Sequence, residues 1–350
     1  MLNYNPVTKE KGECVVVGRA AVGIYLALNE IKKNENQGRN KVLYPAKICY
    51  TAVLPAVYLG LEIVFADVDK ISGLITVETI IDKLDDQFVA AVVPHMYGNP
   101  VPEIAEIAKC LEEKNIALIE DCASLMGQSG KVNKPGLHGD YVIYSTGYAK
   151  TISLGFGGLI FSSKHSLSEI EKFEKTLNPE SSSADEYWGD FSKNYRKYRT
   201  EGQCSKEAQR YFENMRNTSK ENIIFSISDD KRTQILEALS PLSEVIEKRR
   251  EDYKKYDEKL VSTSFVKYEL NEDAVPWRYS FFVEDRSAFV KYCLDNHLPI
   301  SDWYPVVAPI FGDLSDYPSA RWHESRIVNF PLLVGEEEIT RICDVIRGYQ

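Results

Sequence analysis

Short apolar runs alternate with segments of helical spacing through the first half of the chain, and this alternation constrains the fold more than any other feature. The runs cover residues 14–17, 62–65, 88–93, 116–119, 141–144 and 159–161. Helical spacing occurs between them at 20–33, 76–84 and 101–114. Runs this short and apolar are typical of strands buried on both faces. The alternation predicts an α/β fold with a mostly parallel sheet flanked by helices.

The second half of the chain has a different sequence pattern. Residues 232–260 have the pattern of one long, charged helix that is broken near Pro241. Strand patterns follow at 264–268 and 278–283, and helical patterns at 286–296 and 336–347. We therefore expect a large domain over residues 1–230, and a long linking helix with a smaller C-terminal α/β domain over residues 231–350.

Composition limits the class of protein. The 350 residues carry a net charge of −10, which argues against a nucleic-acid or anionic-membrane partner. The basic cluster at 193–199 is short and predicts a solvated helix face. The longest apolar stretch, 52–68, contains a proline, a glycine and a glutamate, so it predicts no membrane span. Seven cysteines without a CxxC pair predict reduced thiols, no metal site and a cytoplasmic location.

The segment that contains Lys150 carries the first sign of chemistry. A strand pattern ends at Ser145, Lys150 follows five residues later, and a glycine-rich stretch leads to the next strand. A lysine amine can form a Schiff base with an aldehyde when enough of it is unprotonated. Taken alone, this segment is more typical of a solvated loop lysine.

Other segments place suitable groups at the same edge of the sheet, because parallel strands end together. Gly18, Arg19 and Ala20 open a helix after a strand, where free backbone N–H groups can bind phosphate. Asp121 ends a buried strand, where a carboxylate either caps a helix or pairs with a cation. The hydroxyl of Ser145 is placed to reach the same phosphate.

Two aromatic residues complete the set. Tyr50 can stack on a planar ring, although an isolated tyrosine is more often core. His95 follows another strand, where it can equally belong to an ordinary loop. Together the segments supply a phosphate site, an anion for a ring nitrogen, a stacking face and an amine. These are the protein groups that pyridoxal 5'-phosphate (PLP) requires.

The order of these segments resembles the sugar aminotransferases of the DegT/DnrJ/EryC1/StrS family. The matching segments are 18–21, 43–45, 60–69, 94–98, 119–124, 145–158, 303–305 and 328–331. The resemblance covers nearly the whole chain. It implies the PLP-dependent transferase fold type I, PLP as the cofactor, and a homodimer with its active site at the subunit boundary.

The same resemblance implies roles for individual residues. Lys150 holds the cofactor as a Schiff base and then moves a proton during the reaction. Asp121 keeps the pyridine nitrogen protonated, so that the ring withdraws electrons from the reacting carbon. Ser145 and the backbone at 18–20 bind the phosphate. Candidate substrate residues are His95, Tyr148, Trp303 and Tyr304.

Several positions depart from the family pattern. Ser124 stands where members commonly carry a longer glutamine or histidine near the ring hydroxyl. Arg19 replaces a threonine or serine, and its guanidinium can reach the phosphate instead. Phe156 replaces a glutamate. The asparagine motif that contacts the cofactor of the partner subunit is not clear around residues 222–225.

The resemblance implies an aminotransferase that takes an amino group from glutamate and gives it to a nucleotide-linked keto-sugar, for polysaccharide or glycosylated-metabolite biosynthesis. A related branch of sugar dehydratases replaces the Schiff-base lysine with histidine, so Lys150 argues against it. A third hypothesis is a catalytically inactive PLP- or sugar-binding regulatory homologue. Ser124, Arg19 and Phe156 motivate that hypothesis.

Overall fold

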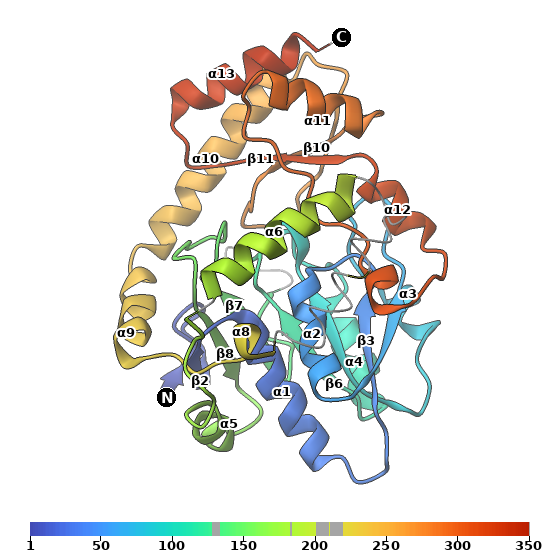
Figure 1. The fold of residues 1–350 in the computed structure, drawn as a ribbon, viewed down its shortest axis with the longest axis vertical. Coiled ribbons are helices and arrows are strands. Elements are labelled where there is room, and N and C mark those ends of the chain that lie inside the picture. The colour runs from blue at the N-terminus through green and yellow to red at the C-terminus, as the bar shows by residue number, and fades with distance from the viewer. Residues whose placement is uncertain (128–133, 183, 201–209, 211–219, 350) are drawn as a thin grey trace.

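The computed structural model describes residues 1–127, 134–182, 184–200, 210 and 220–349, and it contains a large and a small sheet (Figure 1). The large sheet has the strand order β1-β2-β8-β7-β6-β5-β3-β4. Its strands are β1 (Leu2–Tyr4), β2 (Lys11–Val17), β3 (Lys41–Pro45), β4 (Glu62–Ala66), β5 (Phe88–Pro94), β6 (Ala117–Asp121), β7 (Tyr141–Ser145) and β8 (Gly158–Ser162).

Parallel pairing brings the chemistry-bearing ends of the central strands together. Strands β4, β3, β5, β6 and β7 pair in parallel, whereas β8 and β2 pair antiparallel beyond them. The register sets Pro94 opposite Asp121, and Ser145 opposite Gly158. The carboxyl ends of β3, β5, β6 and β7 therefore lie at one edge. The predicted α/β architecture is confirmed.

Alternate residues of the central strands enter different cores, which explains why the runs are apolar throughout. On β5, Ala90 and Val92 join the core beneath α1 (Ala20–Asn34) and α2 (Tyr50–Tyr58). Their neighbours Ala91 and Val93 join the core that contains α4 (Ile104–Glu113). Helices thus cover both faces of the sheet, and the strands lack the polar–apolar alternation of a half-exposed sheet.

The remaining described helices come between or after the strands of the large sheet along the chain. They are η1 (Met96–Gly98), α3 (Val77–Ile81), α5 (Ser168–Glu174), α6 (Ala184–Thr200), α8 (Lys220–Ile223), α9 (Asp229–Ala238), α10 (Leu242–Leu260), α11 (Arg286–Asp295), η2 (Ala308–Phe311), α12 (Pro318–Glu324) and α13 (Glu336–Arg347). The basic cluster at 193–199 lies in α6, and its side chains from 195 onwards lie outside the described residues. No described helix is sufficiently long and apolar to span a bilayer.

The C-terminal part forms the small sheet, β11-β10-β9, from β9 (Val266–Lys267), β10 (Tyr279–Phe282) and β11 (Ile327–Phe330). Pro241 divides the long helical pattern into α9 and α10, as the sequence predicted. Helix α10 then runs from the large sheet to the small sheet, where it packs on α13 (Figure 1). The domain division at residue 230 stays a prediction.

Gly98 joins the two parts through a close backbone contact, and this contact gives a test of the fold. Its φ is +75°, and an added Cβ would lie 1.8 Å from the carbonyl oxygen of Val275. Gly98→Ala should therefore lower the free energy of unfolding by about 3 kcal/mol in chemical denaturation. Gly60 has a similar φ, +66°, but open space around it. Gly60→Ala should cost only about 1 kcal/mol, and equal losses would contradict the contact.

Candidate active site

Three side chains meet at the Lys150 amine. Its Nζ lies 3.2 Å from the Ser124 hydroxyl and 3.3 Å from the Tyr304 hydroxyl. The two hydroxyls are themselves 3.1 Å apart. Ser124 follows β6, Lys150 follows β7, and Tyr304 comes from the C-terminal part, so three distant segments fix one amine. The structure thus brings together three residues that the sequence singled out.

Asp121 faces the same site from the end of β6. The residue is buried, and its Oδ1 accepts a hydrogen bond of 2.9 Å from the Ala123 N–H. Burial raises the pKa of the Asp121 carboxyl, while the Ala123 N–H and the Lys150 amine act against that rise. No described residue donates a hydrogen bond to Oδ2. A buried carboxylate with one oxygen available is suited to receive a cationic ring nitrogen.

The charge on Lys150 is set by opposing effects. Burial by itself lowers the pKa of its amine. The Tyr304 hydroxyl, the Cys49 thiol and the Asp121 carboxylate act in the other direction, and together they leave the pKa above its ordinary value. A raised pKa favours the protonated form of the amine.

Arg249 holds the backbone of the lysine segment. This arginine lies on α10 and is buried, with 6% of its surface exposed. Its guanidinium donates to the carbonyl oxygens of Lys150 at 3.0 Å and of Thr151 at 3.4 Å. Another guanidinium nitrogen donates to the Trp277 carbonyl at 2.9 Å. The carbonyl groups are the acceptors that make burial of this cation tolerable.

Trp277 also fixes the backbone of the segment that contains Lys150. Its indole N–H donates a hydrogen bond of 2.6 Å to the Ala149 carbonyl. Ala149 has a φ of +56°, a left-handed conformation that residues other than glycine rarely adopt. The Trp277 ring also stacks on Tyr304, with 5.4 Å between the ring centroids. One tryptophan thus supports both the lysine backbone and the hydroxyl beside its amine.

The start of α1 has the form of a phosphate site. Arg19 is its N-cap residue but provides no side-chain cap, and the Val22 N–H donates to the Arg19 carbonyl at 3.0 Å, so the N–H groups before Val22 are the ones that a phosphate could bind. Glycines allow the neighbouring backbone to lie close. A Cβ at Gly158 would be 2.8 Å from the Ala20 nitrogen, and one at Gly18 would be 2.4 Å from the Phe225 ring. Ser145 ends β7 beside Gly158.

The Arg19 side chain packs against aromatic rings. Its guanidinium carbon lies 4.2 Å from the Trp188 ring centroid and 5.8 Å from that of Phe225. Burial lowers the pKa of Arg19, and its Nε has no hydrogen-bond partner among the described residues. The phosphate contact of this guanidinium stays a prediction.

Two predicted residues lie in the protein interior. Tyr50 is 1% exposed and stacks on Phe311 with a centroid distance of 5.2 Å, which favours a core role over stacking on a cofactor. His95 is fully buried. The Val101 N–H donates to its Nδ1 at 3.0 Å, which leaves the proton on Nε2, 2.9 Å from Glu120 Oε1. These contacts favour a structural role for His95 over substrate contact.

His95, Glu120 and Cys122 bring three potential metal-ligand atoms within 4.8 Å of one another. Glu120 also accepts hydrogen bonds from the backbone N–H groups of Gly136, His138 and Gly139. Burial raises the pKa of the Cys122 thiol well above its usual range. The carboxylate and imidazole are thus engaged in hydrogen bonds, and this cluster ties a loop to the sheet.

The other two substrate candidates line the outside of the lysine site. Tyr148 is 85% exposed, two residues before Lys150. Trp303 is half-buried beside Tyr304, with 5.5 Å between their ring centroids. Their contact with substrate stays a prediction. Sequence reasoning missed Arg249 and Trp277, whose roles depend on tertiary contacts. A buried lysine, Lys47, was also missed, although its place in the apolar segment after β3 was a signal.

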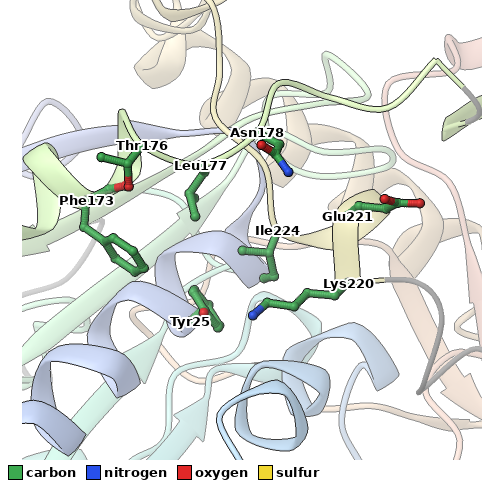
Figure 2. Close-up of a pocket in the computed structure, with 8 residues that line it drawn as sticks. All are labelled: Tyr25, Phe173, Thr176, Leu177, Asn178, Lys220, Glu221 and Ile224. Atoms are coloured by element: carbon green, nitrogen blue, oxygen red, sulfur yellow. The ribbon is translucent and has the colours of Figure 1, made fainter.

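A separate cavity of about 510 Å³ lies beside α1 (Figure 2). It is lined by Tyr25, Phe173, Thr176, Leu177, Asn178, Lys220, Glu221 and Ile224. The Lys220 amine points toward the Tyr25 ring, 5.1 Å from its centroid (Figure 2). None of these lining residues belongs to the lysine site.

Comparison with known proteins gives the class of this site. The family model described as the DegT/DnrJ/EryC1/StrS aminotransferase family matches residues 8–347. A GDP-perosamine synthase of Vibrio cholerae is 29% identical over 181 residues, which are 51% of this chain and 48% of that protein. A GDP-perosamine synthase of Escherichia coli O157:H7 matches over 40% of its length. The chain thus spans less than half the length of these curated relatives.

Solved structures share the fold. The sugar aminotransferase CalS13 from Micromonospora echinospora has a TM-score of 0.74 and 20% identity, covering 96% of this chain and 87% of that one. A GDP-4-keto-6-deoxy-D-mannose-3-dehydratase of E. coli with bound hydrated PLP has a TM-score of 0.68 and 17% identity, with 95% and 87% covered. This protein belongs to the DegT/DnrJ/EryC1/StrS aminotransferase family. PLP is the cofactor of that family.

The residues of this chain fit PLP. The uncapped start of α1 offers N–H groups to a phosphate, and Gly158 lets the backbone approach closely. Asp121 has an oxygen available for a pyridine nitrogen, and Lys150 offers the amine. These four features lie at the carboxyl edge of the sheet, where ligands of open α/β sheets bind.

The Trp277 hydrogen bond provides a test of how the lysine segment is held. Trp277→Phe keeps an aromatic ring but leaves the Ala149 carbonyl without its donor, so the free energy of unfolding should fall by about 1–2 kcal/mol. Trp188→Phe is the control, because the Trp188 indole N–H has no acceptor among the described residues. Denaturant titration of both variants should show the larger loss for Trp277. Equal losses would contradict a specific role for its N–H group.

Proposed function

We propose that this protein is a PLP-dependent aminotransferase that moves an amino group from glutamate to a nucleotide-linked keto-sugar, in polysaccharide or glycosylated-metabolite biosynthesis. The observation that carries the proposal is the Lys150 amine, held by Ser124 and Tyr304 in one site with Asp121. Membership of a sugar aminotransferase family and similarity to GDP-perosamine synthases support the substrate class. A cytoplasmic homodimer is part of the proposal.

Each residue has a defined task in this reaction. Bound PLP supplies an electron sink for the reacting carbon. Asp121 holds a proton on the pyridine nitrogen by placing a negative charge beside it. The Lys150 Nζ takes a proton from the substrate carbon and returns one, which requires a fixed amine position. Ser124 and Tyr304 provide that position through their contacts at 3.2 and 3.3 Å.

Arg278 supports an anionic substrate. Its guanidinium carbon lies 5.0 Å from the Trp277 ring centroid, and Trp277 stacks on Tyr304 beside Lys150. No described residue forms a hydrogen bond or ion pair with this guanidinium. Both proposed substrates are anions, because glutamate carries carboxylates and a nucleotide-linked sugar carries phosphates. An available arginine near the amine suits either group.

The dehydratase branch is the second enzymatic candidate, since one solved relative belongs to it. Lys150 in the Schiff-base position favours amino transfer. A product that has lost a hydroxyl without gaining nitrogen would reverse this assignment. The non-catalytic hypothesis makes a different prediction: PLP binding without turnover across a broad panel of nucleotide-linked keto-sugars.

The first functional test is optical. Purified protein with PLP should absorb near the visible edge, and glutamate should bleach that band because the amino group moves to the cofactor. Lys150→Ala should abolish the band, whereas Lys164→Ala, which removes a partly exposed lysine outside the site, should keep it. Wild-type protein that stays colourless after incubation with excess PLP and removal of the unbound cofactor would refute the proposal.

The second functional test concerns the Asp121 carboxylate. Asp121→Asn removes the negative charge near the ring nitrogen and should reduce turnover about a hundredfold or more, with PLP still bound. The matched control is Asp67→Asn, because Asp67 also follows a parallel strand but accepts hydrogen bonds from Ser319 and Ala320. Steady-state rates with glutamate as donor give the comparison. Similar rates for wild type and Asp121→Asn would exclude the proposed role.

A further inference from the structure

Lys47 is a fully buried lysine at the carboxyl end of β3. Its side chain has no exposed surface, and in the described part of the chain no carboxylate forms an ion pair with it. Its Nζ makes a hydrogen bond with the hydroxyl of Tyr97 and lies 4.6 Å from the centroid of that ring. A lysine is almost never fully buried without an anionic partner, so this amine requires an explanation.

Tyr97 connects this amine to the active site. Its hydroxyl oxygen accepts a hydrogen bond of 3.1 Å from the backbone N–H of Tyr304. The hydroxyl of the same Tyr304 lies 3.3 Å from Lys150 Nζ and 3.1 Å from Ser124 Oγ. Tyr97 itself has a φ of +61°, which is rare for a tyrosine, so the backbone departs from its usual conformation at this residue.

The hydrogen-bond donors and acceptors around Tyr97 indicate whether the Lys47 side chain is a neutral amine or an ammonium group. The Tyr97 oxygen already accepts the Tyr304 N–H, and its own hydrogen needs an acceptor. A neutral Lys47 amine supplies a lone pair for that hydrogen. An ammonium group would supply none, and it would lie buried without an anion bonded to it. Burial also raises the pKa of Tyr97 well above its usual range, so its hydroxyl keeps the hydrogen.

We propose that Lys47 is a positioning residue: its neutral amine ends a hydrogen-bond chain, Tyr304 N–H to Tyr97 O–H to Lys47 Nζ, that holds the Tyr304 ring against the Lys150 amine. The effect of this positioning on catalysis by Lys150 rests on the proposed function, but the hydrogen-bond chain itself does not. This hydrogen-bond chain fixes the backbone of Tyr304, from which its hydroxyl reaches Lys150. Trp277 in turn packs on the face of the Tyr304 ring.

The charged and titratable neighbours agree with a neutral amine. Burial lowers the pKa of Lys47 to about 7, Arg286 acts in the same direction, and the half-buried Glu324 opposes them. The imidazole of His323 stacks on Tyr97, with centroids 5.5 Å apart. Burial lowers the pKa of His323 well below its usual range, so this ring is neutral too.

The neutral amine has a measurable effect on stability. Between about pH 7 and 10 the unfolded chain binds a proton at Lys47 that the folded protein lacks, so folding stability rises with pH across this window. Lys47→Met removes that dependence. Its stability relative to wild type should be highest below pH 7 and should fall steadily toward pH 10 in denaturant titrations. Lys109→Met, at an exposed lysine, should show no such trend.

The position of Tyr304 can be tested without turnover. Tyr304 raises the pKa of Lys150, so its displacement should make Lys150 less basic. In the PLP-free protein, reductive methylation with formaldehyde, followed by peptide mass spectrometry, reports the pH midpoint of Lys150 labelling. Lys47→Met and Tyr97→Phe should each lower that midpoint by about one pH unit, the scale of one hydrogen bond.

Lys47→Gln separates positioning from simple packing, because its amide oxygen can accept the Tyr97 hydrogen without titrating. This variant should keep the wild-type midpoint of Lys150 and lose the pH dependence of stability. Identical midpoints for wild type and Lys47→Met would overturn the proposal, as would a stability difference that does not change between pH 6 and 10. Both results are independent of aminotransferase activity, so failure of the proposed function would be recognised separately.

Discussion

A cationic amine and a buried carboxylate must share one site at the edge of a sheet, and the rest of the structure depends on this pairing. Asp121 and Lys150 are each drawn away from water, and each lowers the electrostatic penalty of the other. Parallel strands bring them together, because β6 and β7 end at the same edge. A one-residue shift of β6 against β7 would turn the Asp121 side chain to the other face of the sheet.

The lysine segment is held from outside the large sheet. Arg249 and Trp277 both come from the C-terminal part, and they hydrogen-bond to three consecutive carbonyl groups, at residues 149–151. Tyr304 reaches the amine from the same part of the chain. The active site is therefore complete only when the small sheet and α10 are packed in place. Gly98 permits the close backbone contact on which that packing depends.

The central strands could be predicted because they are buried on both faces, which leaves an unbroken apolar run in the sequence. The α9–α10 break was also predictable, since Pro241 cannot continue a helix interior. The strands β3 and β11 and the helix α2 were not predicted. Strand β3 begins with a lysine and ends with a proline, and α2 contains Pro55, so local preference opposes structures that burial stabilises.

Part of the site could be predicted because the ends of the buried strands can be located in the sequence. Lys150, Asp121 and Ser145 lie at strand ends, where sequence pattern locates them along the chain. Arg249 and Trp277 act through carbonyl groups that are distant in sequence, and no local pattern encodes such contacts. Lys47 looked like an ordinary charged residue because burial is a property of the folded chain. The aromatic ring of Tyr50 suggests stacking on a cofactor, but in the fold this ring packs against core residues.

Identifying the amine that binds the cofactor tests the pairing of Lys150 with Asp121. Borohydride reduction of the PLP-loaded protein fixes the cofactor on the lysine that holds it, and peptide mass spectrometry then locates the added mass. We expect the cofactor on Lys150, with none on Lys47, which is a fully buried lysine at the same edge of the sheet. Cofactor mass on Lys47, or on no lysine at all, would contradict this expectation.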